Sequence, residues 1–203
     1  MNQKEPIILA ITAASGIIYG IRTLEFLLKN DYKVELIISS KAYYIFKQEL
    51  DIEISHDKNI IREQILNYLD IGSENQNLKV WLDNEIWASP ASGSYKTMGM
   101  IISPASMASI ASIATGLSEN LIARTADVMI KEGRNLVIVP RETPFSAIHL
   151  ENMLKLSKLG VKIVPPVIGF YGMIKTLEDG IDFAVGKILD ASGIPNDLYE
   201  RWH

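Results

Sequence analysis

Short apolar runs of strand length alternate with longer stretches of helical periodicity along almost the whole chain. The strand-like runs lie at 7–11, 33–38, 98–102, 136–139 and 161–164, with a shorter one near Val80. Apolar residues recur at helical spacing in the segments 17–29, 41–50, 57–69, 107–114, 119–131, 147–159 and 176–192. Because strands and helices take turns at the spacing of right-handed crossovers, the sequence predicts a parallel sheet.

The length of 203 residues suits one domain with a well-filled core, and no linker, repeat or low-complexity segment interrupts it. We therefore expect residues 1–203 to form a single-domain, doubly wound, mostly parallel α/β sheet, either Rossmann-like or flavodoxin-like. The tail at about 194–203 contains an aromatic residue, Trp202, at the second-to-last position of the sequence. We expect this tail to dock near a site or a subunit interface.

Composition and charge exclude several classes of function. The net charge of -4 leaves no surplus of cations to neutralise nucleic-acid phosphates. The chain has no cysteine, which excludes disulfides, thiolate catalysis and Cys-ligated metal sites and is compatible with the cytoplasm. No apolar stretch reaches 18 residues, so we expect no membrane span. Three scattered histidines predict no metal site.

The run from Leu136 to Phe145 is the most informative motif. Its apolar residues predict a buried strand that ends at Pro140, a residue that cannot donate to a sheet. Arg141 and Glu142 follow directly. In an open α/β sheet, ligands bind at the carboxyl ends of the strands. Since arginine suits phosphate and glutamate suits proton transfer, the motif predicts an anionic substrate that gains or loses a proton.

Three more predicted strand ends carry small residues and hydroxyls: 12–16, Ser39 and 103–109. Small residues let backbone amides approach an anion, and a helix N-terminus adds positive charge. Plainer interpretations stay open: a tight turn at 12–16, a helix cap at Ser39, and at 103–109 a small-residue helix packed on the sheet or on another subunit. The GxGxxG fingerprint is absent and no acidic residue follows the second strand, which disfavours NAD.

Several charged residues are candidates for phosphate binding or proton transfer, although each alone is more often a solvated surface charge. The candidate cations are Arg124, Lys131, Arg141 and Lys187, and the candidate acids or bases are Glu49 and Glu142. Tyr171 is a candidate phosphate donor. A serine hydrolase is disfavoured, because the chain has no Gly-x-Ser-x-Gly elbow and no aspartate is placed to orient His149.

Five motifs occur together in an order that resembles one known family. They are Ala14-Ser15-Gly16, Ser92-Gly93-Ser94, Gly116 to Lys131, Pro140-Arg141-Glu142-Thr143-Pro144 and Gly169-Phe170-Tyr171. Together they resemble the UbiX-type flavin prenyltransferases, from about Ile7 to Trp202. The Pro-Arg-Glu-Thr-Pro run and the Ile-His-Leu-Glu-Asn-Met-Leu segment that follows it are the most specific part, whereas the Ala-Ser-Gly turn alone is weak.

The resemblance implies a Rossmann-like flavoprotein, usually a dodecamer, that holds FMN between subunits. Such proteins join a dimethylallyl group from dimethylallyl monophosphate to N5 and C6 of reduced FMN, without a metal. The prenylated FMN then serves a partner decarboxylase of the UbiD type, which in bacteria supports ubiquinone biosynthesis.

The resemblance also implies roles for individual residues at matching positions. The residues implied to hold FMN are Ala13, Ala14, Ser15, Ser39, Ser106, Met107, Ala108, Ser109 and Arg141. Those implied for the prenyl phosphate and its surroundings are Tyr171, Lys187, Lys131, Arg141, Arg124, Ser92 and Trp202, with Arg124 also fitting an interface role. The implied catalytic groups are Glu142, Lys131, Ser15 and Glu49.

Two positions depart from the family pattern. Ala13 stands where glycine is usual, which would be strained if that position needs a positive φ. Lys187 stands where arginine is common and keeps the charge without the bidentate fork. Two other functions stay open. A flavin-dependent cysteine decarboxylase of the same fold usually has a histidine early in the chain, where only His56 is available. An FMN carrier would not need the predicted phosphate-binding residues.

Overall fold

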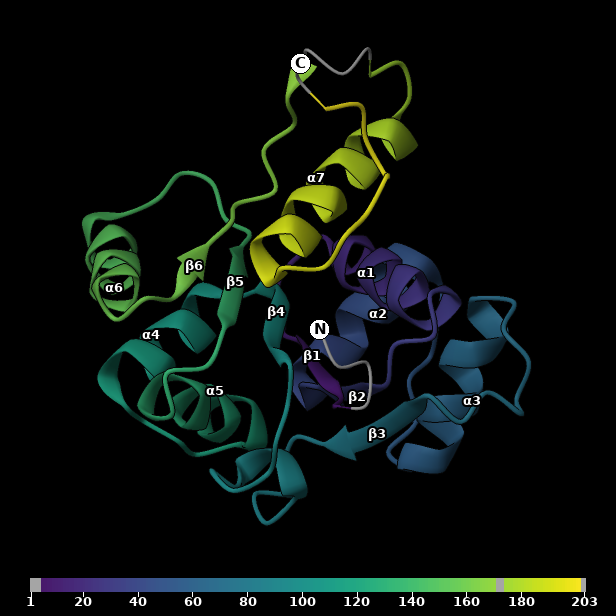
Figure 1. Ribbon diagram of the computed structural model, residues 1–203, viewed down its shortest axis with the longest axis horizontal. Coiled ribbons are helices and arrows are strands. Elements are labelled where there is room, and N and C mark those ends of the chain that lie inside the picture. The colour runs from purple at the N-terminus through teal and green to yellow at the C-terminus, as the bar shows by residue number, and fades with distance from the viewer. Residues whose placement is uncertain (1–4, 171–173, 202–203) are drawn as a thin grey trace.

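The computed structural model describes residues 5–170 and 174–201. One parallel sheet forms its middle layer (Figure 1). The strands are β1 (Ile7–Ile11), β2 (Val34–Ile38), β3 (Leu78–Leu82), β4 (Gly99–Ala105), β5 (Leu136–Pro140) and β6 (Lys162–Ile163). Their order is β3-β2-β1-β4-β5-β6. This is the Rossmann order rather than the flavodoxin order, and the reversal point lies between β1 and β4.

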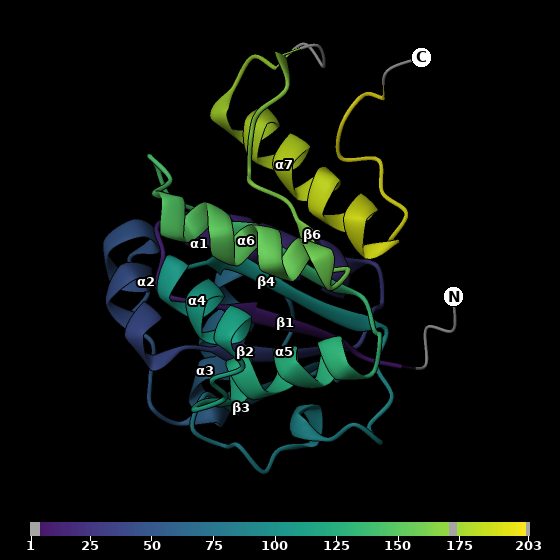
Figure 2. The same cartoon turned by 90° about the vertical axis from the view of Figure 1, so that its left-hand side faces the viewer.

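Helices cover both faces of the sheet, which confirms the doubly wound prediction (Figures 1 and 2). One face carries α1 (Ile17–Lys29), α2 (Tyr43–Leu50), α3 (Lys58–Tyr68) and α7 (Leu177–Ser192). The other carries α4 (Met107–Thr115), α5 (Leu121–Lys131) and α6 (Ala147–Lys158). Two short 3-10 helices complete the described elements: η1 (Ser40–Ala42) and η2 (Ser89–Ala91).

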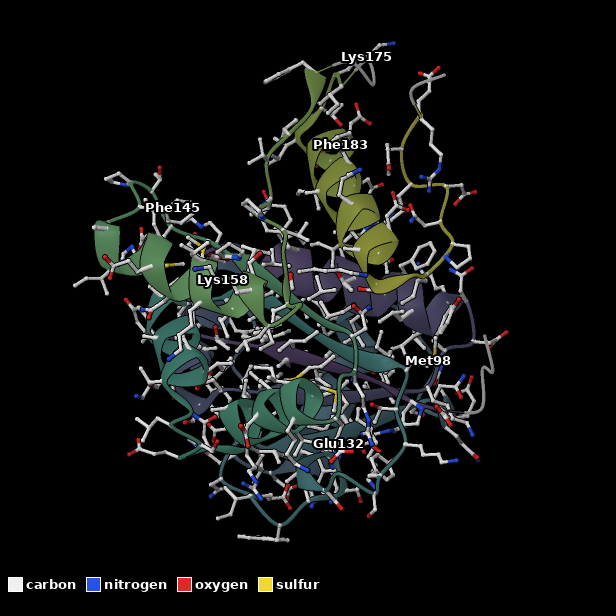
Figure 3. The ribbon with its side chains drawn as sticks, turned by 60° about the vertical axis from the view of Figure 1, so that its left-hand side comes forward. Met98, Glu132, Phe145, Lys158, Lys175 and Phe183 are labelled. Atoms are coloured by element: carbon white, nitrogen blue, oxygen red, sulfur yellow. The ribbon has the colours of Figure 1, made fainter. Side chains whose placement is uncertain are left out.

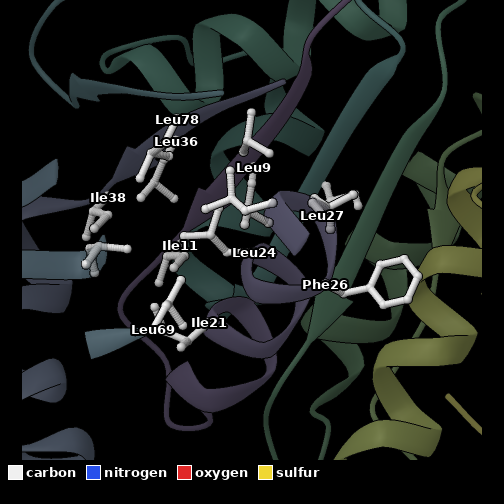
Figure 4. Close-up of a cluster of buried hydrophobic side chains, with 14 of the residues drawn as sticks. Leu9, Ile11, Ile21, Leu24, Phe26, Leu27, Leu36, Ile38, Leu69 and Leu78 are labelled. Atoms are coloured by element: carbon white, nitrogen blue, oxygen red, sulfur yellow. The ribbon is translucent and has the colours of Figure 1, made fainter. Parts of the chain in front are cut away.

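The alternation of side chains along each strand divides the core into two apolar clusters. On β1, Leu9 and Ile11 belong to the cluster under α1, whereas Ile8 belongs to the cluster under α4 and α5. Figure 4 shows Leu9 and Leu24 between the sheet and α1, with Leu36 of β2 beside them. Every residue of β1, β2 and β5 is buried, as expected for central parallel strands covered on both faces.

Most element boundaries agree with the periodicity to within two residues, and the carboxyl end of β4 is the exception. α5 begins two residues after the predicted 119, because Asn120 caps it: the Asn120 side chain accepts a hydrogen bond from the Ala123 amide at 2.9 Å. β4 continues past 102, because Ala105 still pairs with Pro140 after an irregularity in the register.

α7 extends beyond the sheet, and the chain that follows it turns back alongside it (Figures 1 and 2). The turn is made at Gly193, which has a left-handed φ of 74° and closes the helix. Asp190 on α7 accepts hydrogen bonds from Asn196, Tyr199 and Arg201 of the returning tail. No helix in the described part of the chain is both long enough and apolar enough to cross a membrane.

Candidate active site

The loops after β1 and β4 are tied together at the reversal point of the sheet. The hydroxyl of Thr12, a residue only 1% exposed, donates to the Pro104 carbonyl at 3.0 Å and accepts from the Ser106 amide at 2.7 Å. Next to them, the Ser39 amide donates to the Ile11 carbonyl at 2.9 Å. The predicted hydroxyl-bearing strand ends therefore lie at one edge, which we call the carboxyl edge.

The N-terminus of α1 holds a carboxylate from another helix. The Glu49 side chain accepts from the Gly16 amide at 2.9 and 3.0 Å and from the Ile17 amide at 2.9 Å. No side chain of the turn itself caps α1. Gly16 has a φ of 94°, and a Cβ atom there would lie 3.0 Å from the Tyr19 ring. The turn therefore presents backbone amides to an anion, and Glu49 occupies that position.

The serines at the strand ends make different local contacts. The Ser106 hydroxyl caps α4, since it accepts from the Ser109 amide at 3.2 Å. Met107 and Ala108 form the first turn of that helix. Ser39 is the N-cap residue of η1, as one of its two interpretations expects, but its side chain makes no capping hydrogen bond. The Ser15 side chain is exposed at the turn before α1.

Ala13 needs no unusual backbone conformation. Among the described residues, the non-glycine positions with positive φ are Asp31, Asp51 and Asp70, and Ala13 is not one of them. Ala13 is half-buried and Ala14 is buried beside it. The alanine therefore replaces the family's glycine at little cost, and a small side chain is all that the position requires.

Arg141 reaches from the end of β5 across to the turn after β1. Its Nε donates to the Ser15 carbonyl at 3.0 Å, and its amide donates to the Ala105 carbonyl at 3.3 Å. Glu142 is exposed beside it, with Oε1 accepting from the Thr143 amide at 2.9 Å. Arg141, Ser15 and Ser106 thus gather at the carboxyl edge, as the positions of the strand ends predicted, and Glu49 reaches the same edge from α2.

Ser92 and Lys131 lie close to each other, but away from the carboxyl edge. Lys131 ends α5 and pairs with Glu132, and this ammonium lowers the pKa of the Glu132 carboxyl. A Cβ atom at Gly93 would lie 2.8 Å from Lys131 Nζ. Arg134 donates to the carbonyls of Gly93 and Tyr95. We call Ser92, Gly93, Lys131 and Arg134 the amino-edge patch, because α5 ends there just before β5 begins.

One chain does not bring these two groups together. Lys131 precedes β5 and Arg141 follows it, and the strand alone spans roughly 16 Å at about 3.3 Å per residue. Figure 3 shows the same separation between Glu132 and Phe145, which lie next to each group. Arg124 lies two turns before Lys131 on α5, exposed and 4.0 Å from Asp127. The phosphate-binding residues therefore fall into two sets within one chain.

Of the remaining predicted residues, the described part of the chain contains Lys187, which lies on α7. Lys187 is exposed, with Nζ 5.8 Å from the centroid of the Tyr199 ring, and among the described residues it makes no hydrogen bond or ion pair with the carboxyl edge. Tyr171 and Trp202 lie outside the described residues, so their predicted roles are not located by the structure.

Sequence reasoning missed a buried polar cluster beside the amino-edge patch. Glu35 in β2 is only 4% exposed and accepts from Tyr95 Oη at 2.5 Å and from Trp81 Nε1 at 3.0 Å. Burial and the hydrogen bond to Glu35 raise the pKa of Tyr95. The available signal was Glu35 itself, a charged residue inside an apolar strand. Its hydrogen-bond partners could not be predicted, because they lie 46 and 60 residues away in the sequence.

Comparison with known proteins identifies the family. The flavoprotein family model matches residues 1–189. A flavin prenyltransferase UbiX from Halalkalibacterium halodurans is 50% identical over 192 residues, which cover 95% of this chain and 90% of that protein. The chain belongs to the UbiX-type flavin prenyltransferase family. The resemblance predicted from the motifs is therefore confirmed.

Solved structures of this family share the fold over nearly their full length. AnUbiX, solved with FMN and dimethylallyl pyrophosphate, has a TM-score of 0.84 and 38% identity, and the match covers 98% of this chain and 97% of that one. A dodecameric FMN-dependent UbiX-like decarboxylase from Escherichia coli O157:H7 has a TM-score of 0.83 and 34% identity, covering 98% and 99%. Family members have thus been described both as prenyltransferases and as decarboxylases.

Proposed function

We propose that the protein is a flavin prenyltransferase, which transfers a dimethylallyl group from dimethylallyl monophosphate to N5 and C6 of reduced FMN. The observation that carries the proposal is the carboxyl edge, where the Gly16 and Ile17 amides hold a carboxylate beside Arg141. Relatives named flavin prenyltransferase support it, as does the solved relative that binds FMN and a dimethylallyl diphosphate.

The residues at the carboxyl edge fit FMN. An anion is accepted by the backbone amides at α1, since the Glu49 carboxylate already makes three hydrogen bonds there. Hydroxyls of Ser15, Ser39 and Ser109 lie at neighbouring strand ends, and small alanines leave room for a flat ring. The proposed FMN-binding residues are Ala13, Ala14, Ser15, Ser39, Ser106, Met107, Ala108, Ser109 and Arg141. Reduced FMN, when bound, supplies the nucleophilic atoms that accept the prenyl group.

The chain's own residues handle the phosphate. Arg141 at the carboxyl edge, Lys131 on α5 and Lys187 on α7 place positive charge around a phosphate that gains charge as it leaves. Glu142, exposed next to Arg141, gives a proton to a departing phosphate oxygen. Tyr171 and Ser92 donate hydrogen bonds to the same group, and Trp202 helps to exclude water. After the first bond has formed, the freed phosphate or Glu49 takes the proton from C6, and Ser15 lies next to the flavin edge where the ring closes.

We further propose that each complete site is made by more than one copy of the chain. Lys131 and Ser92 lie at the edge of the sheet opposite Arg141, so Arg141 of one copy meets Lys131 and Ser92 of another, together with Arg124 from the same helix as Lys131. A dodecameric relative shows that assemblies of this fold exist. The prenylated product then passes to a UbiD-type decarboxylase.

The proposal is tested anaerobically, with dithionite-reduced FMN and dimethylallyl monophosphate, by the mass of the flavin extracted from the protein. A gain of one C5H8 unit is expected, and reduced FMN without protein is the control. Parallel reactions with dimethylallyl diphosphate measure which phosphate is preferred. FMN recovered unchanged from a protein that binds it would contradict the proposal. Release of CO2 from a peptide with a C-terminal cysteine would favour the decarboxylase alternative instead.

A further inference from the structure

The segment between β3 and β4 has no strand of its own, yet its position relative to α5 is defined by side chains of distant elements. η2 packs against α5, and the residues that follow η2 run past the end of that helix. Ser92 and Gly93 lie in this stretch, next to Lys131. Whatever holds residues 92–95 therefore also determines the surroundings of the Lys131 ammonium.

Glu35 holds this segment from the sheet side. Each of its oxygens accepts one hydrogen bond, Oε1 from Tyr95 at 2.5 Å and Oε2 from Trp81 at 3.0 Å. Among the described residues Glu35 makes no ion pair, so a buried carboxylate is stabilised here by neutral donors alone. Burying a carboxylate is costly unless its oxygens are hydrogen-bonded, and an apolar residue would complete the strand without that cost.

Arg134 holds the same segment from the side of α5. Its guanidinium donates to the Tyr95 carbonyl at 2.6 Å and to the Gly93 carbonyl. Tyr95 is therefore fixed at both its ends, by Glu35 through the hydroxyl and by Arg134 through the backbone. The backbone of residues 93–95 is held against the turn that follows Lys131.

Gly93 is the residue of this segment that contacts Lys131. A Cβ atom at Gly93 would lie 2.8 Å from Lys131 Nζ and 2.5 Å from Glu132 Oε1, so the glycine backbone packs directly on the ion pair. A shift of the segment by a fraction of an ångström would open space beside the ammonium or push it away. The orientation of Lys131 is thus coupled to the Glu35 carboxylate near the start of β2.

We propose that Glu35 is a positioning residue for Lys131. Through Tyr95 it holds residues 92–95 against the end of α5, and so orients the Lys131 ammonium toward the prenyl phosphate. This inference rests on the proposed prenyl transfer for its substrate, but the geometry it describes belongs to the protein alone.

The test is a double-mutant cycle between Tyr95→Phe, which removes only the hydroxyl that Glu35 holds, and Lys131→Ala. Tyr95→Phe should raise the Kd of dimethylallyl monophosphate for the protein loaded with oxidised FMN about tenfold, the size expected for the loss of one hydrogen bond to a charged group, and leave the Kd of FMN unchanged. In the Lys131→Ala background, which is expected to turn over too slowly to give a KM, the same change should have no further effect on that Kd. Tyr68→Phe on exposed α3 is the matched control and should change neither constant. Additive effects in the cycle would overturn the proposal.

A second measurement does not depend on turnover. Lysines labelled by reductive ¹³C-methylation give one NMR signal each, and Lys131→Arg assigns the signal of Lys131. Tyr95→Phe and Glu35→Gln should move that signal and leave that of Lys187 in place. If the Lys131 signal stays unchanged in both variants, the positioning role is wrong, even if the wild-type protein prenylates FMN. If the signal moves but no prenylated FMN forms, the positioning stands and the proposed function fails.

Discussion

The carboxyl edge and the amino-edge patch hold their polar groups in different ways. At the carboxyl edge, the parallel strands align backbone amides and carbonyls: Thr12 and Arg141 bond to main-chain carbonyls, and the Gly16 amide donates to the Glu49 carboxylate. At the amino-edge patch the polar contacts come from long side chains, and Lys131 pairs with Glu132 while Arg134 donates to loop carbonyls. The first region therefore presents backbone amides to an anion, whereas the second presents the exposed Lys131 ammonium on a loop that Arg134 holds in place.

The difference explains why the predicted phosphate-binding residues Lys131 and Arg141 lie apart in one chain. Sheet topology places strand ends side by side, but no sheet can bring the residue before a strand next to the residue after it. Under the proposed assembly, a second copy would remove that restriction. Variants of single residues can test the separate roles of the carboxyl edge and the amino-edge patch, beginning with the largest expected effect.

Glu142→Gln tests whether the carboxyl edge supplies the proton. Turnover should fall by about two to four orders of magnitude, because an amide cannot donate the proton that a departing phosphate needs. FMN affinity, measured by flavin fluorescence, should stay near the wild-type value. Glu63→Gln on exposed α3 is the control. Turnover at the wild-type level would show that Glu142 is not the donor.

Mixing two inactive variants tests whether the two regions meet across copies. Arg141→Ala and Lys131→Ala should each lose most activity alone. If every site takes Arg141 from one copy and Lys131 from another, random mixing after dissociation should restore about a quarter of wild-type activity, since one site in four regains both residues in a symmetric assembly. The double variant mixed with itself is the control. Mixtures as inactive as their components would place both residues in sites of the same copy.

Glu49→Gln tests the anion position at α1 in the absence of ligand. The carboxylate caps two amides at a helix N-terminus, so its loss should lower the free energy of unfolding by about 1 kcal/mol. Urea unfolding of the FMN-free protein measures this, with Glu53→Gln as the control. Equal stability of both variants would mean that Glu49 does not occupy the amides in solution.

The smallest expected effect concerns the tail that follows α7, which is part of neither the carboxyl edge nor the amino-edge patch. Burial alone would raise the pKa of Asp190, but hydrogen bonds from Arg201, Tyr199 and Asn196 outweigh it and lower that pKa. A lowered pKa in the folded state means that the carboxylate stabilises the tail above the ordinary pKa of about 3.9 and loses this effect as the pH falls through the folded value.

An NMR titration of the Tyr199 ring should therefore show the tail attached at pH 7 and released below about pH 4. Asp190→Asn should remove the pH step. Gly186→Ala should detach the tail at every pH, because a Cβ atom there would overlap the Tyr199 ring. A ring signal that is the same in Gly186→Ala as in the wild type would contradict the docked arrangement.

The sequence predicted the elements well because periodicity is a local property. Strand 7–11 and helix 17–29 agree residue for residue with β1 and α1. The carboxyl-edge residues were predictable for the same reason, since Ser15, Ser106 and Arg141 each follow a strand within a few residues. Pairs that lie far apart in the sequence were not predictable: Glu49 on the Gly16 amide and Tyr95 on Glu35 leave no periodic signal.

By itself, the sequence determined the fold class and the family and predicted candidate site residues, because each of these depends on short motifs and on the order of strands and helices. Only the tertiary structure decided the Rossmann strand order, the carboxylate that occupies α1 and the separation of Lys131 from Arg141. The physical reason is that these depend on which strands pair and which side chains meet across the fold, and neither is encoded in any single segment.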